Sequence, residues 1–341
     1  MVASDIPTRW NARRAEPWRA QCAFQTLWPT TRYPFTSRDL TSARDGAETA
    51  KRCATPQRLC SAVPSLALRV ISSPSMSDRA IEALRAEHDE VLRLARTLTE
   101  AEWDAPSDCA GWRIQDVVAH LSNTFRMAVD PGSLPEAVPG DIEATQAVYA
   151  EAHRKWSAAE VVADYQEMAS KAIEMCANFQ RPEFADAQFP MDNAGHYPLH
   201  FLPDAYTFDH FCHLRNDILR PHGPIDRPVP APDELRVGVT VGWMLVGLPQ
   251  MSGVPLHRAA SAPMGLRLTG PGGGEWTLRP GQADGVVTVA EGLLNGVRAT
   301  ATSSALDFVS WGTRRRRWQD SVRVAGDEAL ASGILDAMHV F

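Results

Sequence analysis

The stretch WDAPSDCAGWRIQDVVAHL, residues 103–121, carries the clearest structural signal in the chain. Its first half contains Pro106 and Gly111, which are typical of a loop. From Arg113 to Val129 apolar residues recur every three or four positions, which predicts an amphipathic helix. The stretch therefore predicts a loop that leads directly into a helix, with His120 at the edge of the apolar stripe of that helix.

The same helical spacing continues on both sides of this stretch. A first helix is predicted from residue 77 to about 98, and later ones near 142–156, 157–176, 204–220 and 233–246. Ser157 and Glu160 have the spacing of a capping box, in which two side chains bond the free N–H groups at a helix start. A long proline-containing loop is expected over 180–203, and the proline-rich 221–232 reads as a linker. We therefore expect an α-helical bundle over residues 76–252.

After Gly253 the pattern changes from helical to strand-like. Glycine-rich turns separate short runs that are typical of strands, at 265–269, 275–278, 286–289, 296–302 and 322–324. Two helices are predicted among them, at 303–312 and 328–338. The run Gly270–Gly274 lacks the spacing of a phosphate-binding loop and is interpreted as a hairpin turn. These elements predict a small α+β domain over residues 253–341.

Residues 1–75 differ from the rest of the chain in composition. They carry 11 Lys and Arg against 5 Asp and Glu, a net charge of +6, which leaves −13 for residues 76–341. No helical or alternating period is sustained there, so we expect this segment to be irregular or disordered. Three explanations stay open: translation that starts at Met76, a disordered extension, and a targeting segment.

Composition excludes two broad classes of protein. The net charge of −7 disfavours a nucleic-acid binder that relies on an overall basic field. The longest uncharged apolar stretch, Val237–Leu248, is 12 residues long and too short to span a bilayer. We therefore expect a cytoplasmic protein without a membrane span, which binds no nucleic acid. The sequence does not indicate an oligomeric state.

A cluster of metal-ligating residue types lies in the stretch DHFCHLRND, residues 209–217. Asp209 and His213 are four residues apart, so on a helix their side chains lie side by side and could share one ligand. A carboxylate and an imidazole suit Zn²⁺ or a similar divalent cation, and His120 is the candidate third ligand. Three protein ligands leave a coordination position open for water or substrate. The alternatives are a solvated polar helix face and a hydrogen-bonded histidine at the edge of the core.

The stretch that opens this section resembles the N-terminal signature of the mycothiol-dependent maleylpyruvate isomerase family. That signature combines a Trp, a Pro and a Gly-Trp pair with a helix that carries Asp-Val-Val-Ala-His, as residues 116–120 do. The family has a DinB-like four-helix bundle with a divalent metal. Residues 304–312, the Arg run 314–317 and residues 322–331 are similar to its C-terminal domain, which resembles sterol-carrier-protein folds. The resemblance implies an α-helical DinB-like four-helix bundle followed by a small α+β domain.

The resemblance also implies a ligand set. It places metal ligands at His120, Asp209 and His213, where the family usually has Glu at the position of Asp209. The shorter carboxylate must approach the metal more closely, so the helix shifts or the coordination changes, and His210 could compete for the metal.

The implied activity is that of a metal-dependent thiol enzyme with mycothiol as cosubstrate and Zn as the expected metal. A metal-activated thiolate would add to an electrophilic substrate, which gives isomerisation or thiol transfer. An Arg of the second domain, from the run 314–317 or Arg323, could hold a substrate carboxylate, with Arg317 and Arg323 as the named candidates. Two alternatives stay open: a non-catalytic small-molecule or lipid-binding protein, and a metal-dependent hydrolase that uses a bound water.

Overall fold

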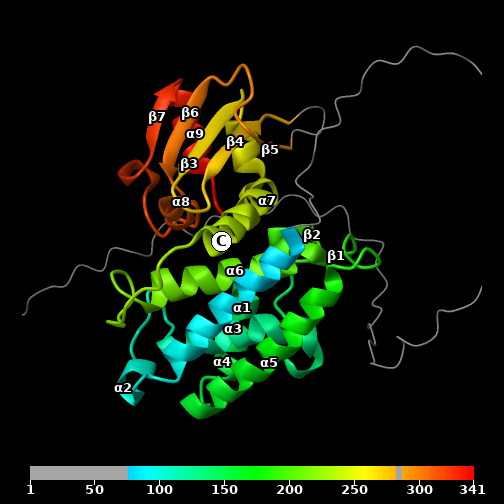
Figure 1. The fold of residues 1–341 in the computed structure, drawn as a ribbon, viewed down its shortest axis with the longest axis vertical. Coiled ribbons are helices and arrows are strands. Elements are labelled where there is room, and N and C mark those ends of the chain that lie inside the picture. The colour runs from blue at the N-terminus through cyan, green and yellow to red at the C-terminus, as the bar shows by residue number, and fades with distance from the viewer. Residues whose placement is uncertain (1–75, 282–285) are drawn as a thin grey trace, which may run out of the picture. The chain divides into compact units, whose positions relative to one another are not determined.

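The structure is a computed structural model, and it describes residues 76–281 and 286–341. The expectation for residues 1–75 lies outside this part of the chain. Within it, a bundle of helices is followed by a five-stranded sheet with its own helices, as Figure 1 shows. This is the fold class predicted from the sequence.

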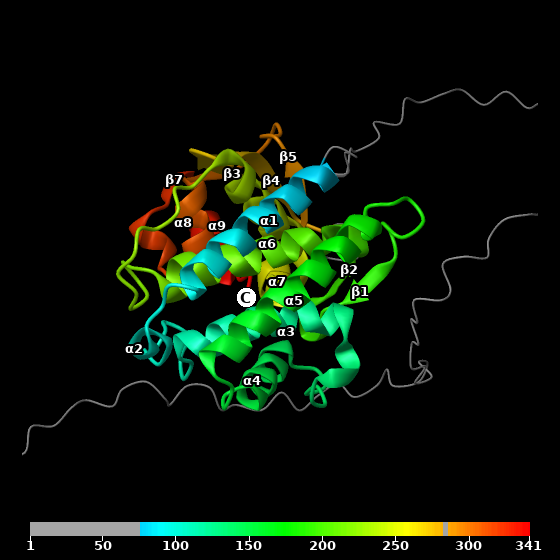
Figure 2. The same ribbon diagram turned by 60° about the horizontal axis from the view of Figure 1, so that its bottom comes forward.

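Four helices form the bundle, and each contacts at least two of the others. They are α1 (Met76–Ala95), α3 (Ile114–Val129), α5 (Ala158–Phe179) and α6 (Leu202–Cys212). The apolar stripe of each helix is buried in one shared core, which includes Leu84, Leu121, Tyr165 and Tyr206. Two further helices are α2 (Glu100–Trp103) and α4 (Ile142–Ala152), and α4 packs on α3 at the outside of the bundle, as Figure 2 shows.

Local signals in the sequence fix where several of these helices begin. Ser157 and Glu160 bond each other's backbone N–H groups at the start of α5, which confirms the predicted capping box. At the start of α3, Asp116 accepts a bond from the backbone N–H of Arg113 at 2.9 Å. The position of His120 along α3 is therefore set by a firm helix start about two turns earlier.

The helix predicted over 204–220 is two different helices in the structure. After α6 the chain continues as a π-helix over His213–Ile218. The wider turn shows in the bond from Leu219 N to Leu214 O, five residues back, at 3.1 Å. Apolar periodicity does not distinguish a π-turn from an α-turn over six residues, which explains the difference.

Helix α7 (Glu234–Ala259) extends well past the end predicted near residue 246. Pro249 and Pro255 lie inside it, and the chain bends at Gly253, where φ is +53°. Proline and glycine normally end a helix. Here Leu248 and Leu256 on the same helix are fully buried, so their packing outweighs the helix-breaking tendency of the prolines and Gly253. The domain boundary expected between 252 and 253 falls at this bend and stays a prediction.

Helix α7 is the element that joins the bundle to the sheet. It contacts α1 and α6 on one side, and α8, α9 and β5 on the other. By length and composition alone it could cross a membrane, but 56% of its most apolar window is buried inside the protein. This burial is typical of a core helix. The helix is nevertheless longer than the 12-residue apolar stretch on which the expectation of no membrane span was based.

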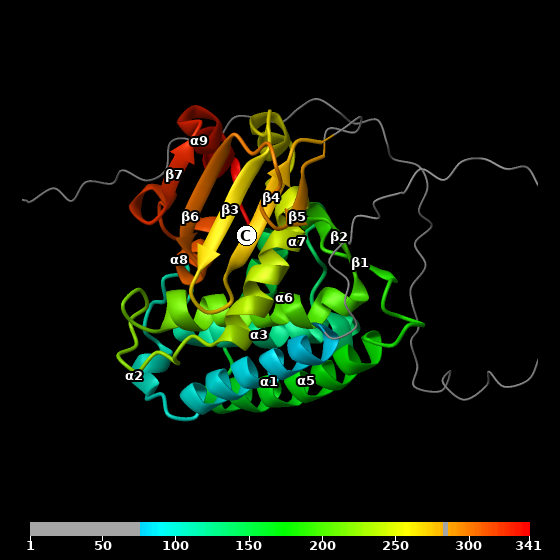
Figure 3. The same ribbon diagram turned by 45° about the horizontal axis from the view of Figure 1, so that its top comes forward.

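The five-stranded sheet has the order β5-β4-β3-β6-β7, which can be followed in Figure 3. Strands β3 and β6 are parallel, and all other neighbours are antiparallel. The bounds are β3 (Met264–Thr269), β4 (Gly274–Arg279), β5 (Thr288–Glu291), β6 (Ala299–Ser304) and β7 (Arg323–Gly326). The hairpin turn predicted at 270–274 joins β3 to β4. Helices α8 (Ala305–Gly312) and α9 (Glu328–Ala337) pack with α7 in a second hydrophobic core.

The segment 180–203, expected to be a loop, contains a small hairpin. Strands β1 (Gln188–Pro190) and β2 (His196–Pro198) pair in antiparallel register around Gly195, whose φ of +113° permits the tight reversal. The side chain of Gln250 on α7 bonds both the N–H and the carbonyl of His196. Three-residue strands bounded by proline leave no readable alternation, so the sequence pattern could not reveal them.

Candidate metal centre

The three residues predicted to bind a metal meet in the bundle interior. Asp209 Oδ1 lies 3.5 Å from His120 Nε2 and 3.3 Å from His213 Nε2. One potential ligand atom from each residue lies within 4.8 Å of the others. Helix α3 supplies His120, α6 supplies Asp209, and His213 begins the π-helical segment. The fold thus brings together residues that are 89 positions apart in the chain.

Each histidine directs the same ring nitrogen toward Asp209. His120 Nδ1 lies 3.2 Å from the amide oxygen of Gln146 on α4, and His213 Nδ1 lies 2.8 Å from Asp217 Oδ2. Both partners are acceptors, so each Nδ1 carries a proton and donates. With Nδ1 donating, a ring that gives up its Nε2 proton to a metal is left neutral, in the tautomer that binds the metal through Nε2.

The carboxylate of Asp209 is poised to accept a cation. Burial raises its pKa, but the two neighbouring imidazoles outweigh burial and hold the pKa well below 3.8. Its second oxygen, Oδ2, is buried and has no hydrogen-bond partner among the described residues. Buried carboxylate oxygens are rarely left without a partner. One carboxylate with a free oxygen and two imidazole nitrogens form a donor set that fits Zn²⁺ or a similar divalent cation.

His210, the possible competitor for the metal, points elsewhere. Its Nδ1 donates to the carbonyl of Tyr206 at 2.7 Å, and its ring packs 4.9 Å from that of Phe125 in the bundle core. Burial lowers the pKa of His210 to about 4, so the ring is neutral. The structure places Asp209 between the two other histidines and leaves His210 outside the group.

Two further residues lie beside the centre: Cys109, which was not singled out from the sequence, and Arg315, which was considered only as one of the Arg run and for a substrate. Cys109 Sγ lies 3.6 Å from His213 Nδ1, and Arg315, from the turn after α8, bonds both carboxylate oxygens of Asp217. The motif around Trp112 pointed to the loop that contains Cys109 but not to the thiol itself. Arg315 belongs to the Arg run 314–317, and nothing in the sequence distinguishes it from the neighbouring arginines.

The arginines proposed to hold substrate lie at the surface. Arg317 caps a short 3-10 turn and Arg323 begins β7, and both are exposed. No hydrogen bond or ion pair joins either side chain to the centre among the contacts of residues 76–281 and 286–341. Their role toward a substrate stays a prediction.

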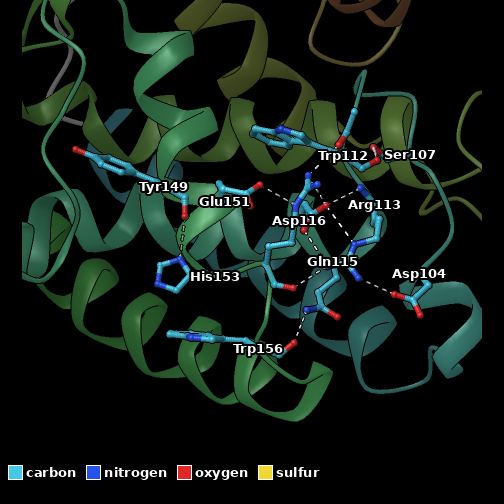
Figure 4. Close-up of polar contacts among 12 residues, drawn as sticks. Asp104, Ser107, Trp112, Arg113, Gln115, Asp116, Tyr149, Glu151, His153 and Trp156 are labelled. Atoms are coloured by element: carbon cyan, nitrogen blue, oxygen red, sulfur yellow. Dashed lines mark hydrogen bonds and ion pairs between the residues drawn. The ribbon is translucent and has the colours of Figure 1, made fainter.

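A polar network holds the loop before α3 in place, as Figure 4 shows. Asp116, which is 1% exposed, accepts bonds from the guanidinium groups of Arg113 and Arg154. Arg154 also donates to the carbonyl of Gly111 at 3.0 Å, which ties the loop to the end of α4. The loop residue Trp112 places its ring 5.1 Å from that of His120. The network therefore fixes the ring of Trp112 beside the centre.

Comparison with known families supports the resemblance seen in the sequence. Residues 84–215 match the family described as the mycothiol maleylpyruvate isomerase N-terminal domain, which confirms the expected family relationship of the bundle. A comparison of the sequence with curated proteins finds no match.

Two solved structures are similar to this one. A mutant of the mycothiol-dependent maleylpyruvate isomerase is 12% identical, with a TM-score of 0.44 over 74% of this chain and 94% of that chain. The enzyme without the mutation gives a TM-score of 0.43 at the same identity and coverage.

Proposed function

Since residues 84–215 match the mycothiol maleylpyruvate isomerase N-terminal domain, we propose that the chain is a divalent-metal-dependent thiol enzyme of that kind. The observation that carries the proposal is Asp209, with one oxygen between two imidazole Nε2 atoms and the other without a partner. His120, Asp209 and His213 would hold the metal, with Zn²⁺ as the expected ion. The thiol would be mycothiol, and we expect the enzyme to act in the cytoplasm.

The chemistry of the group is that of a Lewis acid: a bound divalent cation lowers the pKa of a thiol that reaches its open position, so thiolate forms at neutral pH. The chain's own residues prepare that position. A metal binds histidine only where the ring nitrogen has lost its proton, so the ligand set would present two neutral imidazoles and one carboxylate to the cation, a net charge of −1. His120 and His213 are 6% and 8% exposed and the Asp209 side chain is 23% exposed, which limits access of water to the ligands.

The thiolate would act on an electrophilic substrate such as maleylpyruvate. Addition of sulfur to the conjugated double bond, rotation about the resulting single bond and elimination of the same thiolate give cis–trans isomerisation. The thiol is regenerated, so atoms and electrons balance without another reactant. Addition without elimination would give thiol transfer, and the same site would serve for it.

The proposal is tested by two measurements, the amount of bound metal and the dependence of activity on mycothiol. The full chain, the His213→Ala variant and a control variant, His196→Ala, would be purified and their bound Zn²⁺ measured by elemental analysis. His196 is an exposed histidine on β2 and lies outside the centre. We expect about one equivalent of metal in wild type and control, and a loss of at least about tenfold in affinity in His213→Ala.

Activity separates the enzyme from its alternatives. Maleylpyruvate isomerisation would be followed with and without mycothiol, and we expect turnover only with the thiol. Full metal loading of His213→Ala would show that the ligand assignment is wrong. Isomerisation without thiol would refute the mechanism, whereas cleavage of the substrate by water would point instead to a metal-dependent hydrolase.

A further inference from the structure

The carboxylate of Asp217 connects the metal centre to the C-terminal part of the chain. It is 2% exposed and lies in the π-helical segment, four residues after His213. Asp217 Oδ2 accepts a bond from His213 Nδ1 at 2.8 Å. The same oxygen accepts a bond from Arg315 Nη2 at 2.7 Å, while Oδ1 accepts one from Arg315 Nε at 3.0 Å.

Arg315 holds this carboxylate in one orientation. A guanidinium that bonds both oxygens of a carboxylate fixes its plane, which a single bond would leave free to rotate. The backbone N–H of Arg315 itself bonds the carbonyl of Ser310, so the arginine starts from a rigid turn after α8. Ser310 also donates from Oγ to Asn216 Oδ1 at 3.3 Å, which is a second contact between the same two segments.

The backbone around Asp217 is fixed as well. Its carbonyl accepts a bond from the N–H of Asp108 at 3.0 Å, and Asp108 belongs to the loop that precedes α3. The π-helical turn is therefore held from the bundle side by its backbone and from the α8 side by its carboxylate. Neither contact uses the Nε2 face of His213, which is left for the metal.

We infer that Arg315 and Asp217 are positioning residues for the metal ligand His213, so that the C-terminal α+β part completes a centre whose ligands all lie in the bundle. The inference rests on the proposed metal-binding function. Asp217 keeps the proton of His213 on Nδ1 and fixes the ring plane, which presents the Nε2 lone pair toward Asp209. Arg315 acts through Asp217 and touches neither the metal ligands nor a reacting atom.

This assignment differs from a substrate-binding role for the Arg run. The Nε–Nη2 edge of Arg315, which is the edge best suited to a carboxylate, is already occupied by Asp217. Loss of Arg315 should therefore change the affinity for metal even when no substrate is present. A substrate-binding arginine would leave that affinity unchanged.

The test measures Zn²⁺ affinity of the full chain by competition with a chromophoric chelator. The variants are Asp217→Ala, Arg315→Ala, Arg315→Lys and the double variant of the two alanine substitutions, with folding checked by circular dichroism. The control is Arg298→Ala, which removes an exposed arginine of the same α+β part that pairs with Asp327.

We expect affinity to fall by about 10- to 100-fold in Asp217→Ala, which is typical when a hydrogen-bond partner of a metal-bound histidine is lost. Arg315→Ala and Arg315→Lys should both weaken binding, because lysine keeps the charge but not the two parallel bonds. If Arg315 acts through Asp217, the double variant should lose no more affinity than Asp217→Ala alone. The control should stay within about twofold of wild type.

The possible outcomes separate this inference from the proposed function. A wild-type chain that binds no Zn²⁺ overturns both. A wild type that binds Zn²⁺, with unchanged affinity in Arg315→Ala, overturns the positioning role alone. Losses that add in the double variant show that Arg315 acts independently of Asp217, which also overturns it. Should Arg315→Ala fail to fold, Arg315→Lys and Asp217→Ala carry the same comparison.

Discussion

The carboxyl group of Asp204 makes the stability of the bundle depend on pH in an unusual direction. Asp204 lies in the first turn of α6 and is 7% exposed. Burial raises its pKa from 3.8 to about 8, and a hydrogen bond from the backbone offsets only part of this rise. In the folded protein the group is therefore protonated at neutral pH, whereas in the unfolded chain it is ionised.

The sign and size of the effect follow from this difference. Between pH 4 and pH 8 the folded state binds one proton more than the unfolded state, so the free energy of unfolding falls as the pH rises. Each pH unit in that window costs about 1.4 kcal/mol. From pH 5 to pH 7 this single group should lower the free energy of unfolding by about 2–3 kcal/mol. Above the folded pKa the loss levels off.

The substitution Asp204→Asn isolates this contribution, since the amide is close in shape and cannot ionise. We expect the variant to gain about 2–3 kcal/mol relative to wild type between pH 5 and pH 7. Urea unfolding of the full chain would be followed by tryptophan fluorescence at pH 5, 6, 7 and 8. The exposed Asp320→Asn serves as a control and should follow the wild type at every pH. Parallel curves for Asp204→Asn and wild type would refute the reasoning.

Three further substitutions test how the fold is held. Arg215→Met should cost about 3–5 kcal/mol of unfolding free energy, because it leaves Glu87, which is 0% exposed, without its two-bond partner. Adding Glu87→Leu should recover most of that loss, and no recovery by urea unfolding would argue against the pair. Ser157→Ala removes the cap of α5 and should cost about 1 kcal/mol, seen as a drop of a few degrees in Tm; an unchanged Tm would contradict it. Gly272→Ala should cost about 1–3 kcal/mol or more, because φ is +69° and a Cβ would lie 2.4 Å from Gly238 N; wild-type stability by the same urea assay would speak against that geometry.

The sequence allowed prediction of the features that repeat along the chain. Apolar periodicity located α1, α3 and α5, and the capping pair at Ser157 and Glu160 located the start of α5. The four-residue spacing of Asp209 and His213 placed them side by side, because that relation is local to one helix. His120 was a candidate third ligand from its place at the edge of an apolar stripe, and the family resemblance added the expectation that it pairs with them, since no pattern in a single sequence reports contacts between distant helices.

The parts that escaped prediction depend on tertiary packing. The end of α7 was missed because burial of Leu256 outweighs the helix-breaking tendency of Pro249 and Gly253. The contact of Arg315 with Asp217 joins residues 98 positions apart, and the four consecutive arginines 314–317 have identical chemistry. Only the turn after α8 decides which of them faces the bundle.

The pairing of Asp217 with Arg315 also bears on the order in which the protein is assembled during synthesis. The two ligand-bearing helices leave the ribosome well before the turn after α8, and contacts of large sequence separation form late because they close long loops. A nascent chain synthesised only as far as the bundle would contain all three metal-binding side chains but not Arg315, which orients His213 through Asp217. Metal capture at full strength would then coincide with completion of the polypeptide, so an interrupted chain would hold its ion weakly and release it.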